Sequence, residues 1–146
     1  MTTATRELAT QVHELMRRQA DLLDELDQAR KDARKERDSL LRDVLEVMDG
    51  AQRAQQRVKD PEAREVFGSI ARQVELIFVS AGLATFSFEA GVTPPLGEID
   101  VVSTVSNPAF ADLAVVRTVH AGLRDNERII RKAAVEINRL EQGEET

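Results

Sequence analysis

The sequence contains no cysteine, tryptophan or tyrosine, and only five phenylalanines among its 146 residues. Without cysteine the chain can form neither a disulfide nor a thiolate metal site, and it has no cysteine nucleophile. An aromatic content of 3% is low for a compact core of this length. We therefore expect the chain to bury much of its apolar surface by pairing helices.

Long apolar runs are also missing. The longest uncharged, apolar-rich stretch, Leu76 to Phe88, is shorter than the about 20 residues that a membrane-spanning helix needs. The N-terminus carries charges every few residues, so we expect no signal peptide and a cytoplasmic protein that does not enter a membrane. Residues 61–146 contain 8 Lys and Arg but 13 Asp and Glu, which disfavours a nucleic-acid-binding surface.

Motifs that carry catalysis are absent. There is no glycine-rich phosphate-binding loop and no serine elbow of the hydrolase type. His13 and His120 have no second histidine at the spacing of a metal site. Carboxylates are plentiful but lie along charged segments typical of solvated helix faces, as in the pairs Glu14–Arg18, Asp27–Lys31, Asp38–Arg42 and Asp49–Arg53. We expect no enzyme activity, no metal and no cofactor.

The first third of the chain has a seven-residue apolar repeat. Steps of three and four residues predict one helix over residues 6–57, about 80 Å long, with Gln19 and Glu36 as polar interruptions of the seam. No other segment is long enough to cover this seam, so a second copy in a parallel homodimer is the simplest partner. The predicted dimerisation residues are Leu8, Val12, Leu15, Leu22, Leu26, Leu40, Val44 and Val47.

A second helix is predicted directly after the first. Asp60 followed by Pro61 is a typical helix start, and Gly82 is a typical helix end. Two such helices, doubled by a second copy, would make a four-helix bundle. The apolar face of the second helix is predicted to consist of Val66, Phe67, Ile70, Val74, Ile77, Phe78 and Ala81.

After Gly82 the apolar period changes to two. Alternation predicts strands around residues 84–88, 99–105 and 113–120, with a turn from Gly122 to Glu127. The last segment, residues 127–140, is ambiguous: it fits a helix through Ile130 and Ile137, and also one face of a strand through Arg131, Val135 and Ile137. Periodicity alone slightly favours the helix there.

Two motifs resemble the GrpE family, the nucleotide exchange factors of DnaK-type chaperones. VLEVMDGAQRA (residues 44–54) is similar to the family's L-L-P-V-x-D-x-L-x-R-A-L, and HAGLRDNERIIRKAAVEI (residues 120–137) matches K-G-Y-x-L-N-G-R-x-L-R-P-A-x-V-x-V without a gap. The likeness covers roughly residues 20–138. The chain resembles a divergent member, because the family's D-P-x-x-H is here Pro94-Pro95-Leu96-Gly97-Glu98, and Leu123 and Glu127 replace a tyrosine and a glycine.

The resemblance implies a co-chaperone in protein folding and stress response. Its β domain would wedge open the nucleotide-binding domain of a DnaK-type chaperone so that ADP leaves. The implied contact residues are Arg53, Val119, Asn126 and Arg128, and Gly122 would supply a backbone turn. The resemblance also favours a strand for the last segment.

The predicted fold class is therefore α+β, with a long coiled-coil helix (residues 1–58), a second bundle helix (residues 59–82) and a small all-β domain (residues 83–146). The alternative function is a structural coiled-coil adaptor without exchange activity, whose β domain docks an unrelated protein.

Overall fold

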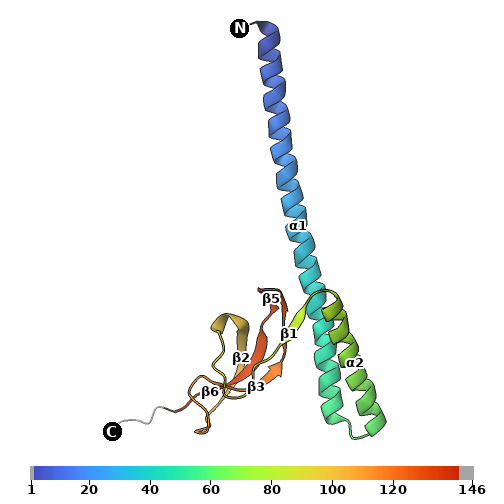
Figure 1. Ribbon diagram of the computed structural model, residues 1–146, viewed down its shortest axis with the longest axis vertical. Coiled ribbons are helices and arrows are strands. Elements are labelled where there is room, and N and C mark those ends of the chain that lie inside the picture. Colours follow the sequence, from blue (N-terminus) through green and yellow to red (C-terminus); the bar gives the residue numbers. More distant parts are fainter. Residues whose placement is uncertain (1, 142–146) are drawn as a thin grey trace, which may run out of the picture. The chain divides into compact units, whose positions relative to one another are not determined.

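The computed structural model describes residues 2–141 and divides the chain into two compact units, Met1–Leu40 and Leu41–Thr146. Met1, the first residue of the predicted long helix, and residues 142–146, the last of the predicted β domain, lie outside the described residues. The fold is α+β, with two helices followed by six strands (Figure 1). Among residues 2–141 there is no helix that is both long and apolar enough to cross a membrane.

Helix α1 runs from Thr3 to Arg57, close to the predicted bounds. The Thr2 hydroxyl accepts a hydrogen bond from the backbone N–H of Thr5 and so caps the first turn. Two of the predicted ion pairs along the helix form, each with a nitrogen–oxygen distance of 3.1 Å: Glu14–Arg18 and Asp27–Lys31. Residues 3–40 of α1 belong to the first unit and residues 41–57 to the second.

Helix α2 spans Pro61 to Ser80 and begins and ends as the sequence predicts. The Asp60 carboxylate accepts a hydrogen bond from the Ala63 N–H, and Pro61 occupies the first turn. At the other end Gly82 has φ +77°, and the Leu83 N–H donates to the Phe78 carbonyl. This is a Schellman cap, which satisfies carbonyls that the last helical turn leaves free.

The face that α2 buries matches the predicted one only in part, since Val74 and Phe78 are buried as predicted. Figure 1 shows α2 folding back along the C-terminal part of α1, and the α2 residues buried there are Gly68, Ala71, Val74 and Phe78. Of the predicted face, Val66, Ile70 and Ile77 are exposed. The helix has apolar residues on two sides, so periodicity alone could not decide which side meets α1.

Six strands form two three-stranded sheets. The first has the order β1-β4-β5, built from Ala84–Phe86, Gly122–Asp125 and Arg128–Arg131, all antiparallel. The second has the order β2-β6-β3, built from Ile99–Val105, Ala133–Asn138 and Val115–His120. Within it β6 pairs parallel with β2 and antiparallel with β3, and a short 3₁₀ turn, η1 (Leu96–Glu98), precedes β2.

Of two sequence predictions about the last third, one is wrong and one is confirmed. Residues 122–125 form strand β4, so the predicted turn from Gly122 to Glu127 is wrong, and the turn consists of Asn126 and Glu127 alone. The segment from Arg128 to Asn138 forms two strands, which confirms the strand that the resemblance favours over the helix that periodicity slightly favoured. Its ladder partners explain this outcome, because β6 lies between β2 and β3 and so pairs on both edges.

Two clusters of buried side chains hold the second unit together. One joins α1, α2 and the β1-β4-β5 sheet through Leu45, Met48, Ala51, Ala71, Val74, Phe78, Leu83, Leu123 and Ile130. The other lies in the β2-β6-β3 sheet and consists of Ile99, Val115, Ala133, Val135 and Ile137. The first cluster means that the C-terminal part of α1 packs with the β domain as well as with α2.

Candidate partner-binding site

Val119 lines a polar groove between the end of α1 and the second sheet. The groove has a volume of about 660 Å³, and the α1 side contributes the amides of Gln52, Gln55 and Gln56. Strand β3 and the segment after β1 form the other wall. Arg53, which follows Gln52 on the helix, is exposed and lies outside the residues that line the groove. The structure thus places Val119 opposite the helical turn that carries Arg53.

The other two predicted contact residues lie on the β4–β5 hairpin, in the first sheet. Asn126 is exposed and has φ +54°, a left-handed conformation that asparagine tolerates better than most residues. Arg128, the first residue of β5, is half-buried, and its guanidinium lies 3.6 Å from the Asp125 carboxylate. The hairpin therefore presents one amide and one positioned arginine together, separate from the groove that Val119 lines.

A buried ion pair, which sequence analysis missed, fixes α1 to the β domain. Arg131 donates to both Asp49 carboxylate oxygens, at 2.5 and 3.2 Å, and also to the Ala121 carbonyl. His120 Nδ1 lies 3.7 Å from the same carboxylate. The sequence prediction that Asp49 pairs with Arg53 on a solvated face is wrong, because Asp49 is only 5% exposed. Its place beside Met48 and Ala51 in the apolar stripe was the available signal.

Gly122 is required for packing and not for a turn. It lies in strand β4 directly opposite Phe86 of β1, and a methyl group added to it would overlap the Phe86 ring. The Arg124 guanidinium covers this ring at 4.2 Å from its centre and also lies 3.5 Å from the Glu98 carboxylate. The expectation of a backbone turn at Gly122 is thus wrong, since the residue is extended within a sheet.

Most of the predicted dimerisation residues carry exposed apolar side chains in the single chain. Val44 is the exception, because it is half-buried and packs against the first core cluster. The exposed ones are Leu8, Val12, Leu15, Leu22, Leu26, Leu40 and Val47. On α2, Val66, Ile70 and Ile77 add a second exposed apolar stripe in the other unit. Contiguous apolar stripes of this kind mark interaction surfaces.

The described residues include no group of three His, Cys, Asp or Glu side chains placed to hold a metal ion. His13 is exposed on α1, and the one carboxylate beside His120 is already held by Arg131. Comparison of the sequence with protein-family models and with curated proteins finds no match to either.

Proposed function

We propose that the chain is a GrpE-like co-chaperone that acts as a parallel homodimer and promotes ADP release from a DnaK-type chaperone. The proposed mechanism needs no covalent chemistry. A β domain that binds the open nucleotide cleft more tightly than the closed one shifts the chaperone toward the open state, from which ADP escapes. The free energy of this shift equals the difference between the two binding free energies.

The observation that carries the proposal is the Asp49–Arg131 ion pair. Asp49 belongs to the first GrpE-like motif and Arg131 to the second, 82 residues later in the chain. The two motifs therefore meet through Asp49 and Arg131, which match the aspartate of the first motif and an arginine of the second. A chance likeness of two separate segments gives no reason for such a buried, bidentate contact.

The exposed apolar residues of the helices support the dimer. Leu15 and Leu22, in the first unit, are 63% and 64% exposed. Val66 and Ile77, on the α2 side of the second unit, are 58% and 60% exposed. A second copy supplies the same stripes in return, which is the self-complementary arrangement of a twofold interface. In this assembly α1 pairs along its seam, and α2 completes a four-helix bundle.

Two surfaces are proposed to contact the chaperone. The β4–β5 hairpin presents Asn126 and Arg128, and a guanidinium suits this role because it can donate to carboxylates and carbonyls in pairs. The second surface combines Arg53 with the groove that Val119 lines, where the three glutamine amides can donate and accept hydrogen bonds.

The direct test measures release of a fluorescent ADP analogue from a DnaK-type chaperone of the same organism, with and without the chain. We expect faster release with the wild type and a marked loss with Arg128→Ala, because a charged hydrogen bond at an interface contributes about 1–3 kcal/mol. Lys132→Ala, an exposed substitution just after β5, is the matched control and should behave like the wild type. Arg124 is no neutral control because its guanidinium packs over Phe86.

The same experiment separates the exchange factor from the structural adaptor. A dimer that leaves ADP release unchanged with every DnaK-type chaperone of the organism would contradict the exchange activity and favour the adaptor. Equal effects of Arg128→Ala and Lys132→Ala would show that Arg128 is an ordinary surface charge.

A further inference from the structure

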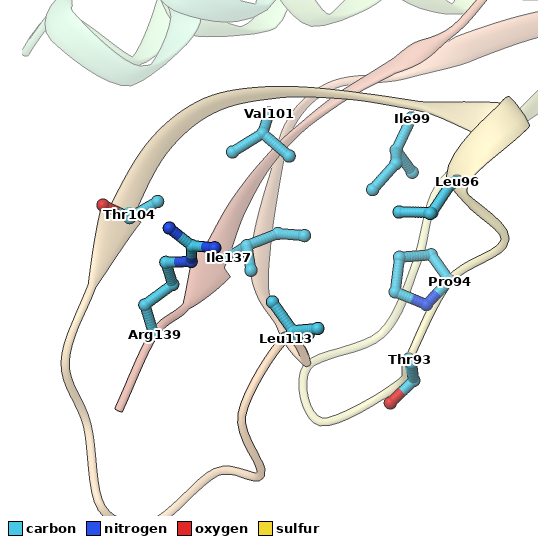
Figure 2. A pocket seen from close by; sticks show the side chains of 9 residues that line it. All are labelled: Thr93, Pro94, Leu96, Ile99, Val101, Thr104, Leu113, Ile137 and Arg139. Atoms are coloured by element: carbon cyan, nitrogen blue, oxygen red, sulfur yellow. The ribbon is translucent and has the colours of Figure 1, made fainter. Parts of the chain in front are cut away.

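The second sheet holds an apolar cavity that the proposed exchange function does not use. Its volume is about 480 Å³, within the range of roughly 300–1,000 Å³ typical of small-molecule sites. Ile99 and Ile137, both from the second core cluster, are only 5% and 4% exposed and form part of its wall. Figure 2 shows these side chains directed into a space over which strand β2 arches.

An irregularity in β2 shapes one wall. The register against β6 shifts between Val101 and Ser103, so the regular alternation of faces is interrupted there. As a result Thr104 lines the cavity with Ile99 and Val101, whereas the Ser103 hydroxyl bonds to the Glu136 carboxylate at 2.8 Å. Simple alternation from the sequence would have placed Ser103 in the cavity and Thr104 outside.

A strained residue shapes the opposite wall. Leu113 has φ +65°, in the left-handed region that a large side chain rarely adopts, and its side chain lines the cavity while remaining 47% exposed. The buried Asn138 holds the loop that leads to Leu113. Its amide accepts from the Asn107 N–H and donates to the carbonyls of Asn107, Phe110 and Ala111, and its own carbonyl accepts from the Leu113 N–H at 2.7 Å.

One end of the cavity carries a positive charge. Arg139 and Thr104 lie at that end in Figure 2, with Leu96 and Pro94 at the other. Among residues 2–141 no carboxylate pairs with the Arg139 guanidinium. No aromatic side chain lines the space, which favours a flexible aliphatic ligand over a flat ring.

We infer that this cavity binds an aliphatic monocarboxylate of the fatty-acid type. The carboxylate pairs with the Arg139 guanidinium and accepts from the Thr104 hydroxyl. The hydrocarbon chain lies over Ile137 and Val101 and ends against Leu96. A guanidinium fork matches a carboxylate bidentately, and the aliphatic walls take the apolar chain. Leu96, which is 81% exposed, would lose apolar surface to water when the hydrocarbon chain packs against it.

The test titrates the full chain with hexanoate, octanoate and decanoate below their micelle concentrations, by calorimetry and by NMR shifts of the methyl groups of Ile99, Val101 and Ile137. Affinity should rise roughly threefold to fourfold for each added methylene that the cavity buries. Arg139→Gln should weaken decanoate about tenfold or more while leaving decanol binding unchanged. Arg117→Gln is the matched control, since Arg117 lies on β3 outside the cavity, with its side chain 64% exposed.

Val101→Glu places an anion in the space and should abolish decanoate binding, and circular dichroism checks that the sheet is retained. Absence of saturable decanoate binding to the wild type would overturn the inference. Equal losses for Arg139→Gln and Arg117→Gln, or shifts confined to residues outside the cavity, would overturn it as well. Binding of a peptide with a C-terminal leucine but not of decanoate would reassign the cavity to a protein partner.

Discussion

The ion pair between Asp49 and Arg131 connects helix α1 to the β domain through two hydrogen bonds. The Asp49 side chain is only 6% exposed, and it accepts two hydrogen bonds from one guanidinium. Burying a carboxylate is unfavourable unless a partner compensates its lost hydration. The pair therefore adds little net stability. Its main effect is to determine which turn of α1 contacts the β domain.

Removing one partner of this pair should destabilise the second unit. Asp49→Ala leaves the half-buried Arg131 guanidinium with the Ala121 carbonyl as its remaining acceptor among residues 2–141, and we expect a loss of about 3 kcal/mol in the free energy of unfolding. Arg131→Met should cost a similar amount, and the double variant should cost clearly less than the sum. Urea denaturation followed by circular dichroism measures all three. Strict additivity would mean that the two residues do not act as a pair.

Gly122 offers a second test at the residue scale. Gly122→Ala should cost about 1–3 kcal/mol, because the added methyl group must displace the Phe86 ring from its place opposite β4. In the Phe86→Leu variant, Gly122→Ala should cost less stability than it does in the wild type, because the ring that the added methyl group would displace is gone. Gly97→Ala is the control, since an added methyl group there meets nothing within 4 Å. Equal melting temperatures for the two glycine variants would contradict the packing argument.

At the scale of elements, the first unit consists of one helix and contains no core of its own. Every described residue of it is exposed apart from Asp38. The second unit has two buried clusters that combine both helices and both sheets. Because helices without tertiary contacts are only marginally stable in water, the proposed dimer would supply the packing that the first unit lacks in the single chain.

On heating, the two units should unfold at different temperatures. Gln19 and Glu36 interrupt the apolar seam, so the proposed dimer buries less apolar surface at these two positions. Residues 3–40 of α1 should therefore lose their helical structure reversibly, at a lower temperature than the second unit unfolds. Replacing Gln19 and Glu36 with Leu should move the lower step upward. Gln28→Leu, away from the seam, should leave it in place. Circular dichroism at several protein concentrations records both steps. A single transition with a concentration-independent midpoint would contradict this prediction.

At the scale of the whole molecule, the proposed assembly is the parallel homodimer. Sedimentation at micromolar concentration should give about twice the chain mass of 16.3 kDa. Leu22→Lys combined with Leu26→Lys places two charges in the seam and should shift the equilibrium toward the monomer. Asp21→Lys combined with Gln28→Lys adds the same residue type on the outer face of the helix, away from the seam, and should leave the dimer intact. A wild-type monomer at micromolar concentration would exclude the assembly.

Elements whose signals lie in neighbouring residues can be predicted from the amino-acid sequence. A helix start at Asp60-Pro61 and a stop at Gly82 depend on neighbouring backbone groups, so they could be predicted from a few adjacent residues, as could the unbroken α1 repeat. The alternating strands before Gly122 follow from the same local logic.

The tertiary structure alone decided which partners the ambiguous residues found. Two sides of α2 are apolar, and only packing against α1 selected Gly68 and Ala71 over Val66 and Ile70. The segment around Ile130 became strand because neighbouring strands, remote in sequence, offered hydrogen bonds. Asp49 found Arg131, and the shift in β2 turned Thr104 toward Arg139. Contacts between distant segments depend on the free energy of the whole core. Many residues far apart in the sequence contribute to it, so no local sequence pattern predicts these contacts.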